Sequence, residues 1–143
     1  MTCRWLLALV VVAFLVPSCA SISDAIKAKD EGTVTTYPVD FEQSWKIAVR
    51  VLRWEDAETI EEHKDENYMV TTVGENLISA GAVVAVWVEP VNAKSTKITV
   101  VTKRKMQTNI ATGLTETKFH QRFKQAVEIV KSGKTLPSEP PGS

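Results

Sequence analysis

Residues 81–103 read GAVVAVWVEPVNAKSTKITVVTK, and this stretch decides the fold. The first part, GAVVAVWVEPV, is a nearly continuous apolar run, which is typical of a central strand buried on both faces of a sheet. Pro90 closes that strand, and residues 92–95 supply the turn. Residues 96–103 then alternate between apolar and polar side chains, as a strand with one buried face does. We therefore predict two adjacent antiparallel strands at the heart of the domain.

The segments upstream show a second pair of strands. Residues 59–64 and 68–73 are separated by the turn-forming residues 65–67, and this arrangement predicts a hairpin. Residues 33–37, TVTTY, are β-branched and aromatic, and Pro38 ends that strand. The four strands after residue 58 are expected to form a meander.

Two amphipathic helices are predicted, over residues 41–54 and 115–131. Asp40 precedes the first helix as a good N-cap, and Gly133 follows the second as a C-terminal cap. Each helix carries apolar residues at the spacing of one helix face. The residues that define the two faces are Phe41, Trp45, Ala48 and Leu52 in the first helix, and Phe119, Phe123, Ala126, Val127 and Val130 in the second.

The predicted order of elements is β-α-β-β-β-β-α. This order indicates an α+β fold, in which an antiparallel sheet of four to five strands is covered on one face by two helices. The domain is expected to span residues 33–132. Residues 19–32 form a short polar segment, which is interpreted as a tether with at most one helical turn after Ser23. Residues 133–143 are proline-rich, have nothing to pack, and are predicted to be disordered.

The amino terminus carries a targeting signal. Arg4 is followed by the uninterrupted apolar run WLLALVVVAFLV over residues 5–16. A membrane-spanning helix needs about 20 apolar residues, so this run is too short to span but fits the central region of a secretory signal peptide. Residues 1–18 are therefore predicted to be a signal peptide.

The residues Val16-Pro17-Ser18-Cys19 resemble the cleavage box of bacterial lipoproteins, although Pro17 departs from the usual pattern. The resemblance implies that the signal is cut between Ser18 and Cys19, and that Cys19 receives acyl chains such as palmitate. Ala20, where an Asp would retain many lipoproteins in the inner membrane, implies the outer membrane, with the domain facing the periplasm. The alternative is ordinary signal cleavage near Ser18 or Ala20, which would leave a soluble secreted protein.

Motifs in the mature chain also resemble an uncharacterised family of short bacterial envelope lipoproteins. In addition, the order of elements is similar to that of the helix-grip domains in the lipoprotein subunit of the outer-membrane barrel-assembly machine, a likeness of topology alone. Neither resemblance implies a catalytic residue. The matching residues are Thr36-Tyr37-Pro38, Phe41, Trp45, Glu89-Pro90-Val91 and Lys97-Ile98-Thr99-Val100.

Composition excludes several classes of function. The 17 basic and 17 acidic side chains give a net charge of zero, whereas a nucleic-acid-binding protein needs a basic excess. Cys3 and Cys19 are the only cysteines, so a disulfide framework and a cysteine metal site are not expected. His63 and His120 have no partner at metal-ligand spacing. The acidic segment 55–66 is interpreted as a solvated hairpin, and a hydrolase built on it is the weakest alternative.

We therefore expect no enzyme and no cofactor. The predicted function is that of a lipid-anchored envelope lipoprotein acting as a binding or accessory module, with the membrane and an envelope protein as partners. The candidate contact residues are Trp54, interpreted as partly exposed, and the basic run Lys103, Arg104 and Lys105, which could face anionic lipid. The alternative is a lipid or small-molecule carrier with a pocket between the sheet and the helices.

Overall fold

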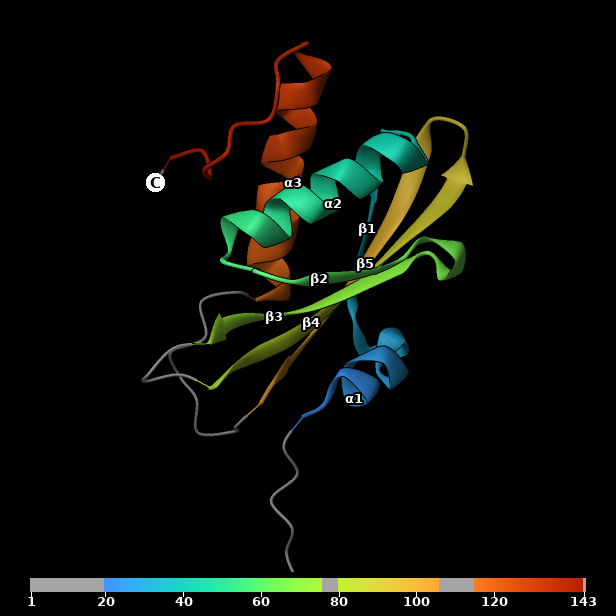
Figure 1. Cartoon of the computed structure of the whole chain (residues 1–143). Helices are drawn as coiled ribbons and strands as arrows, with labels where there is room; N and C mark the ends of the chain where they lie inside the picture. Colours follow the sequence, from blue (N-terminus) through green and yellow to red (C-terminus); the bar gives the residue numbers. More distant parts are fainter. Residues whose placement is uncertain (1–19, 76–79, 106–114, 143) are drawn as a thin grey trace, which may run out of the picture.

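The computed structural model describes residues 20–75, 80–105 and 115–142 of the 143-residue chain. One antiparallel sheet has the strand order β1-β5-β4-β3-β2 and is open at both edges, with helices α2 and α3 on one face and α1 on the other (Figure 1). The predicted α+β class and the meander are confirmed. The elements are α1 Ile22–Lys27, η1 Lys29–Glu31, β1 Thr33–Tyr37, α2 Phe41–Trp54, β2 Ile60–His63, η2 Lys64–Glu66, β3 Tyr68–Glu75, β4 Ala80–Asn92, β5 Ser95–Arg104 and α3 Glu116–Lys131.

The β4–β5 hairpin lies at the centre of the sheet, as predicted. Its register places Val86 opposite Val100 and Trp87 opposite Thr99. Successive residues of β4 point to opposite faces, and both sets are buried, which explains why its sequence does not alternate. Val84 belongs to the core beneath α2 and α3, whereas its neighbour Val83 belongs to a second apolar cluster against α1. The strand continues past Pro90, where the pairing becomes irregular, rather than ending there.

Helices α2 and α3 form the upper layer. The Asp40 side chain caps α2 by accepting a hydrogen bond from the Gln43 backbone N–H at 2.8 Å. Leu52 from α2, and Phe119 and Phe123 from α3, are fully buried against the sheet. Each side chain of this size contributes about 1.5–3 kcal/mol when it leaves water, so this layer supplies most of the core.

The prediction that residues 19–32 form a tether is wrong for the part that the structure describes. Residues 22–27 form α1, which packs on the sheet face opposite α2 and α3 and buries Ala25 and Ala28 (Figure 1). Two alanines give too little apolar area to stand out in the sequence, but their small side chains let the helix approach Val83 and Ala85 closely. Gly32 completes the approach, because a Cβ there would lie 2.7 Å from the Val100 carbonyl oxygen.

The prediction of a disordered tail is also wrong for the described residues 133–142. Gly133, with φ of +78°, ends α3 in a Schellman motif, in which the Lys134 N–H donates to the Ile129 carbonyl at 3.2 Å. The chain then turns back beside α3 (Figure 1). Leu136 packs against the core. The prolines in this segment restrict its backbone in the unfolded chain, and this lowers the entropy cost of ordering it.

Candidate functional site

The described part of the chain starts at Ala20, and the folded domain begins almost at once, with helix α1 at Ile22. Ser18 and Cys19, the predicted cleavage and lipidation residues, lie outside the described residues. Two residues later, Ser21 caps α1: its hydroxyl accepts from the Asp24 N–H at 3.2 Å, and the Asp24 carboxylate accepts from the Ser21 N–H at 2.8 Å. The bond from the Ser21 N–H, together with one that the Ser21 hydroxyl donates to the Asp24 carboxylate at 2.8 Å, holds the pKa of Asp24 below its ordinary value. Helix α1 is therefore capped at Ser21, two residues after Cys19.

Part of the predicted basic run lies beside this start. Lys103 and Arg104, at the end of β5, line a surface hollow together with Ala20 and Lys27. Acidic groups share the hollow, since Lys103 pairs with Glu31 at 2.6 Å. Arg104 is exposed. The structure thus places two of the three predicted basic contacts next to the residue that follows Cys19.

Of the two remaining lysines in this region, Lys27 lines the hollow and Lys105 does not. The Lys105 N–H donates to the Gly81 carbonyl at 3.1 Å, and Lys105 is not among the residues that line the hollow. Lys27 was missed by sequence reasoning, because it lies in the segment that was interpreted as a tether. The capping box formed by Ser21 and Asp24 could have predicted the helix that carries Lys27, although not its contact with β5.

Trp54 does not form the partly exposed contact that was predicted. Only 6% of its surface is exposed, because the tail covers it. Its indole Nε1–H donates to the Pro137 carbonyl oxygen at 3.1 Å. Trp45, Trp87 and Phe119, which were expected in the core, are buried as predicted.

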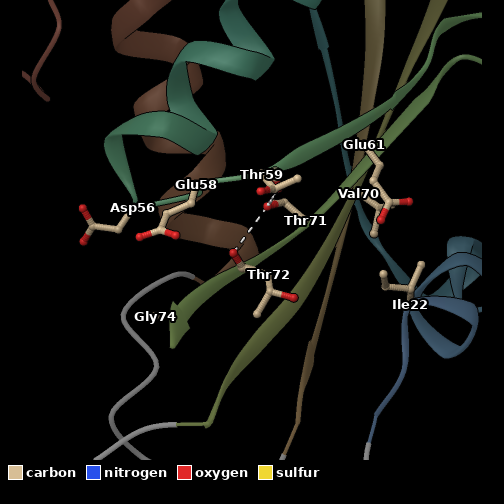
Figure 2. Close-up of a pocket in the computed structure, with 9 residues that line it drawn as sticks. All are labelled: Ile22, Asp56, Glu58, Thr59, Glu61, Val70, Thr71, Thr72 and Gly74. Atoms are coloured by element: carbon tan, nitrogen blue, oxygen red, sulfur yellow. Dashed lines mark hydrogen bonds between the residues drawn. The ribbon is translucent and has the colours of Figure 1, made fainter. Parts of the chain in front are cut away.

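The acidic hairpin borders a second hollow, between β2, β3 and the start of α1 (Figure 2). Asp56 and Glu58 lie at one end of it and Glu61 at the other, with threonine side chains between them. The Thr71 hydroxyl is already used, since it donates to the Thr59 carbonyl at 2.5 Å. Within the described ranges no three metal-ligating side chains gather in one place.

The two histidines lie in different environments. His63 stacks on Tyr68 at the end of the β2–β3 hairpin, with ring centroids 4.5 Å apart. His120 is buried: its Nε2–H donates to the Thr33 carbonyl at 3.0 Å, and Nδ1 accepts from the Tyr37 hydroxyl at 2.9 Å. Burial lowers the pKa of His120 and raises that of Tyr37 to about 12. This pair holds α3 against β1 as neutral groups.

The space between the sheet and α2 and α3, where a carrier pocket was expected, is filled by packed side chains. Phe119, Phe123 and Leu52 are completely buried there, together with Val86 and Ile98 from the sheet. The hollows lined by the residues named above open at the surface. Among the described helices, none has the length and apolar character needed to cross a membrane.

Comparison of the whole chain with protein families, with curated proteins and with solved structures finds no match. The functional argument therefore depends on the residues themselves.

Proposed function

We propose that the protein is a lipid-anchored lipoprotein of the bacterial outer membrane, in which Cys19 carries the acyl chains and the α+β domain acts as a non-enzymatic binding or accessory module. The observation that carries the proposal is the short connection between the lipoprotein-like box and the fold. Helix α1 begins at Ile22, three residues after Cys19, and is packed on the sheet. Three extended residues span at most about 10 Å, so the anchor would hold the domain directly at the bilayer surface.

The charges near the start of α1 suit this position. Lys27, Lys103 and Arg104 surround the same hollow as Ala20. Salt screens charges over a Debye length of about 8 Å under physiological conditions. Side chains held this close to the bilayer would therefore still be attracted to anionic headgroups. The electrostatic contribution is small beside the anchor, because each buried CH₂ adds about 0.8 kcal/mol and two or more acyl chains make attachment permanent.

A binding role is favoured by the way the ionisable side chains are distributed. Asp56 and Glu58 lie at the opposite end of their hollow from Glu61, and the buried His120–Tyr37 pair is engaged in hydrogen bonds between α3 and β1. Two of the surface hollows are lined by both charged and apolar residues, as contact surfaces are.

The intact mass of the mature protein extracted from membranes tests the anchor. We expect a mass that begins at Cys19 and includes acyl chains, and we expect that species to disappear in a Cys19→Ser variant. Cys3→Ser is the matched control, because Cys3 lies in the predicted signal and its loss should leave the mature mass unchanged. An unmodified protein in the soluble fraction of wild-type cells would refute the proposal and favour a freely secreted domain.

A further inference from the structure

The tail is held by two side-chain donors from different helices. Besides the bond from Trp54 of α2 to the Pro137 carbonyl, the Arg122 guanidinium of α3 donates to the Pro141 carbonyl at 2.7 Å. Proline has no N–H of its own, so a proline-rich segment presents carbonyl acceptors without donors that need partners. Both contacts therefore recognise backbone carbonyls of a proline-containing segment that bends at residues 138–139.

The donors are positioned by the fold rather than by the tail. The Glu55 carboxylate, whose side chain is 9% exposed, lies 3.6 Å from Arg122 Nε and 2.6 Å from Lys118 Nζ. This network holds the guanidinium of α3 beside Glu55, the residue that follows Trp54 at the end of α2. A guanidinium held by a nearly buried carboxylate is already oriented before a ligand binds, which reduces the entropy cost of binding.

The tail also separates two surface hollows and forms a wall of each. One lies between the tail and α2, with Val49 and Leu136 in its lining, and the other lies between the tail and α3, with Ile129 and Pro141. Basic side chains outnumber acidic ones around the pair of hollows. Outside the tail itself, the basic ones are Lys46, Arg50, Arg53 and Lys124, against the acidic Glu62 and Glu128.

We propose that the surface crossed by the tail, which we call the tail site and define by Trp54, Arg122, Val49 and Ile129, is a docking site for proline-containing acidic segments of partner proteins. The two donors select the proline backbone, and the basic rim selects negative charge. The tail is the resident competitor, and its sequence LPSEPPG has the expected composition, including Glu139. This inference rests on the proposed role as a binding module and not on the anchor.

Competition from the tail predicts the form of the binding experiment. A segment tethered by a few residues has an effective concentration on the order of millimolar, so a partner peptide must displace it. The test uses full-length protein extracted in detergent, beside a variant with Leu136→Gly, Pro137→Gly, Pro140→Gly and Pro141→Gly. The probe is a fluorescent peptide with the sequence of residues 133–142, GKTLPSEPPG, and its anisotropy is measured.

We expect the peptide to bind the glycine-tail variant about tenfold or more tightly than wild type, and a peptide with all prolines changed to glycine not to bind. Adding Trp54→Phe, which keeps the ring but removes the donor, should weaken binding about tenfold. Trp87→Phe, on the opposite face of the sheet, is the matched control and should not. Absence of binding to the folded glycine-tail variant, or equal binding to Trp54→Phe, would overturn the proposal.

A second measurement on unmodified protein covers the case in which the glycine-tail variant does not fold. Millimolar peptide carrying a nitroxide spin label should broaden the indole N–H resonance of Trp54 and leave that of Trp87 unbroadened. An unchanged Trp54 resonance in saturating peptide would overturn the proposal. Neither result depends on acylation, so failure of this inference and failure of the Cys19 mass test are distinguishable.

Discussion

The carboxylate of Glu116 joins the edge strand β1 to its neighbour β5, and its removal should measurably destabilise the domain. Its Oε2 accepts from the Thr33 backbone N–H at 3.0 Å and also from the Thr33 hydroxyl, and its Oε1 accepts from the Thr102 N–H at 3.0 Å. The residue occupies the first position of α3, where the helix dipole also favours negative charge. One side chain thus satisfies backbone donors on two strands.

The magnitude follows from the number of donors that lose their acceptor. A hydrogen bond to a charged group contributes about 1.5–3 kcal/mol when buried, and we take about 1 kcal/mol for each backbone donor because this site is partly open to water. Glu116→Ala should therefore lower the free energy of unfolding by about 2 kcal/mol, or the Tm by about 8 °C for a domain of this size. Glu116→Gln should cost about half as much, because an amide offers one acceptor oxygen and turns its NH₂ toward the other donor.

Urea denaturation followed by tryptophan fluorescence measures both variants. Glu128→Ala, at an exposed position of the same helix, is the control and should change the free energy of unfolding by less than about 0.5 kcal/mol. A Glu116→Ala variant as stable as this control, or a Glu116→Gln variant as stable as wild type, would refute the assignment of a bridging role.

Three further predictions concern the other packed segments. Burial lowers the folded-state pKa of His120, so the contribution of His120 to stability is complete above pH about 6.5 and is lost as the pH falls. When Tm is measured against pH, His120→Gln should therefore flatten the acid side of the curve, whereas His63→Gln should not. Gly32→Ala should cost about 1–3 kcal/mol in urea denaturation, since the new Cβ would collide with backbone 2.7 Å away. Ala25→Glu should release α1 from the sheet, so that hydrogen exchange becomes faster in residues 22–27 while β4 stays protected. The control Lys27→Glu should leave α1 in place. Unchanged exchange in Ala25→Glu would show that α1 is not docked through Ala25.

The central part of the fold was predictable because its signals are local. The continuous apolar run of β4 and the stripe through Phe119 and Phe123 each report burial by their own periodicity. Asp40 marked the start of α2 at the correct residue for the same reason: an N-cap acts on backbone groups within one turn. Where a segment's structure follows from its own residues, the prediction held.

The two segments that were predicted wrongly depend on distant partners. Ala25 and Ala28 show no apolar stripe until Val83, Ala85 and Val101 supply the surface against which they pack. The tail contains prolines that alone indicate disorder, and it becomes ordered because Trp54 and Arg122 donate to its carbonyls. The same cause makes Trp54 buried although it ends an amphipathic helix. Contacts separated by 83 residues, such as Trp54 to Pro137, are not encoded in any local pattern.

These two segments lie on opposite layers of the domain, and this arrangement connects the anchor with the tail site. Helix α1 occupies one face of the sheet, whereas the tail runs beside α3 in the layer on the other face (Figure 1). With Cys19 acylated, the short connection to α1 keeps the α1 end of the molecule at the bilayer, because three residues give little freedom to reorient. In the proposed orientation the sheet would separate the tail site from the membrane, and the layer of α2 and α3 would lie on the side away from the lipid. A docking site in that position is open to partners in the aqueous compartment, which is where a lipid-anchored binding module requires it.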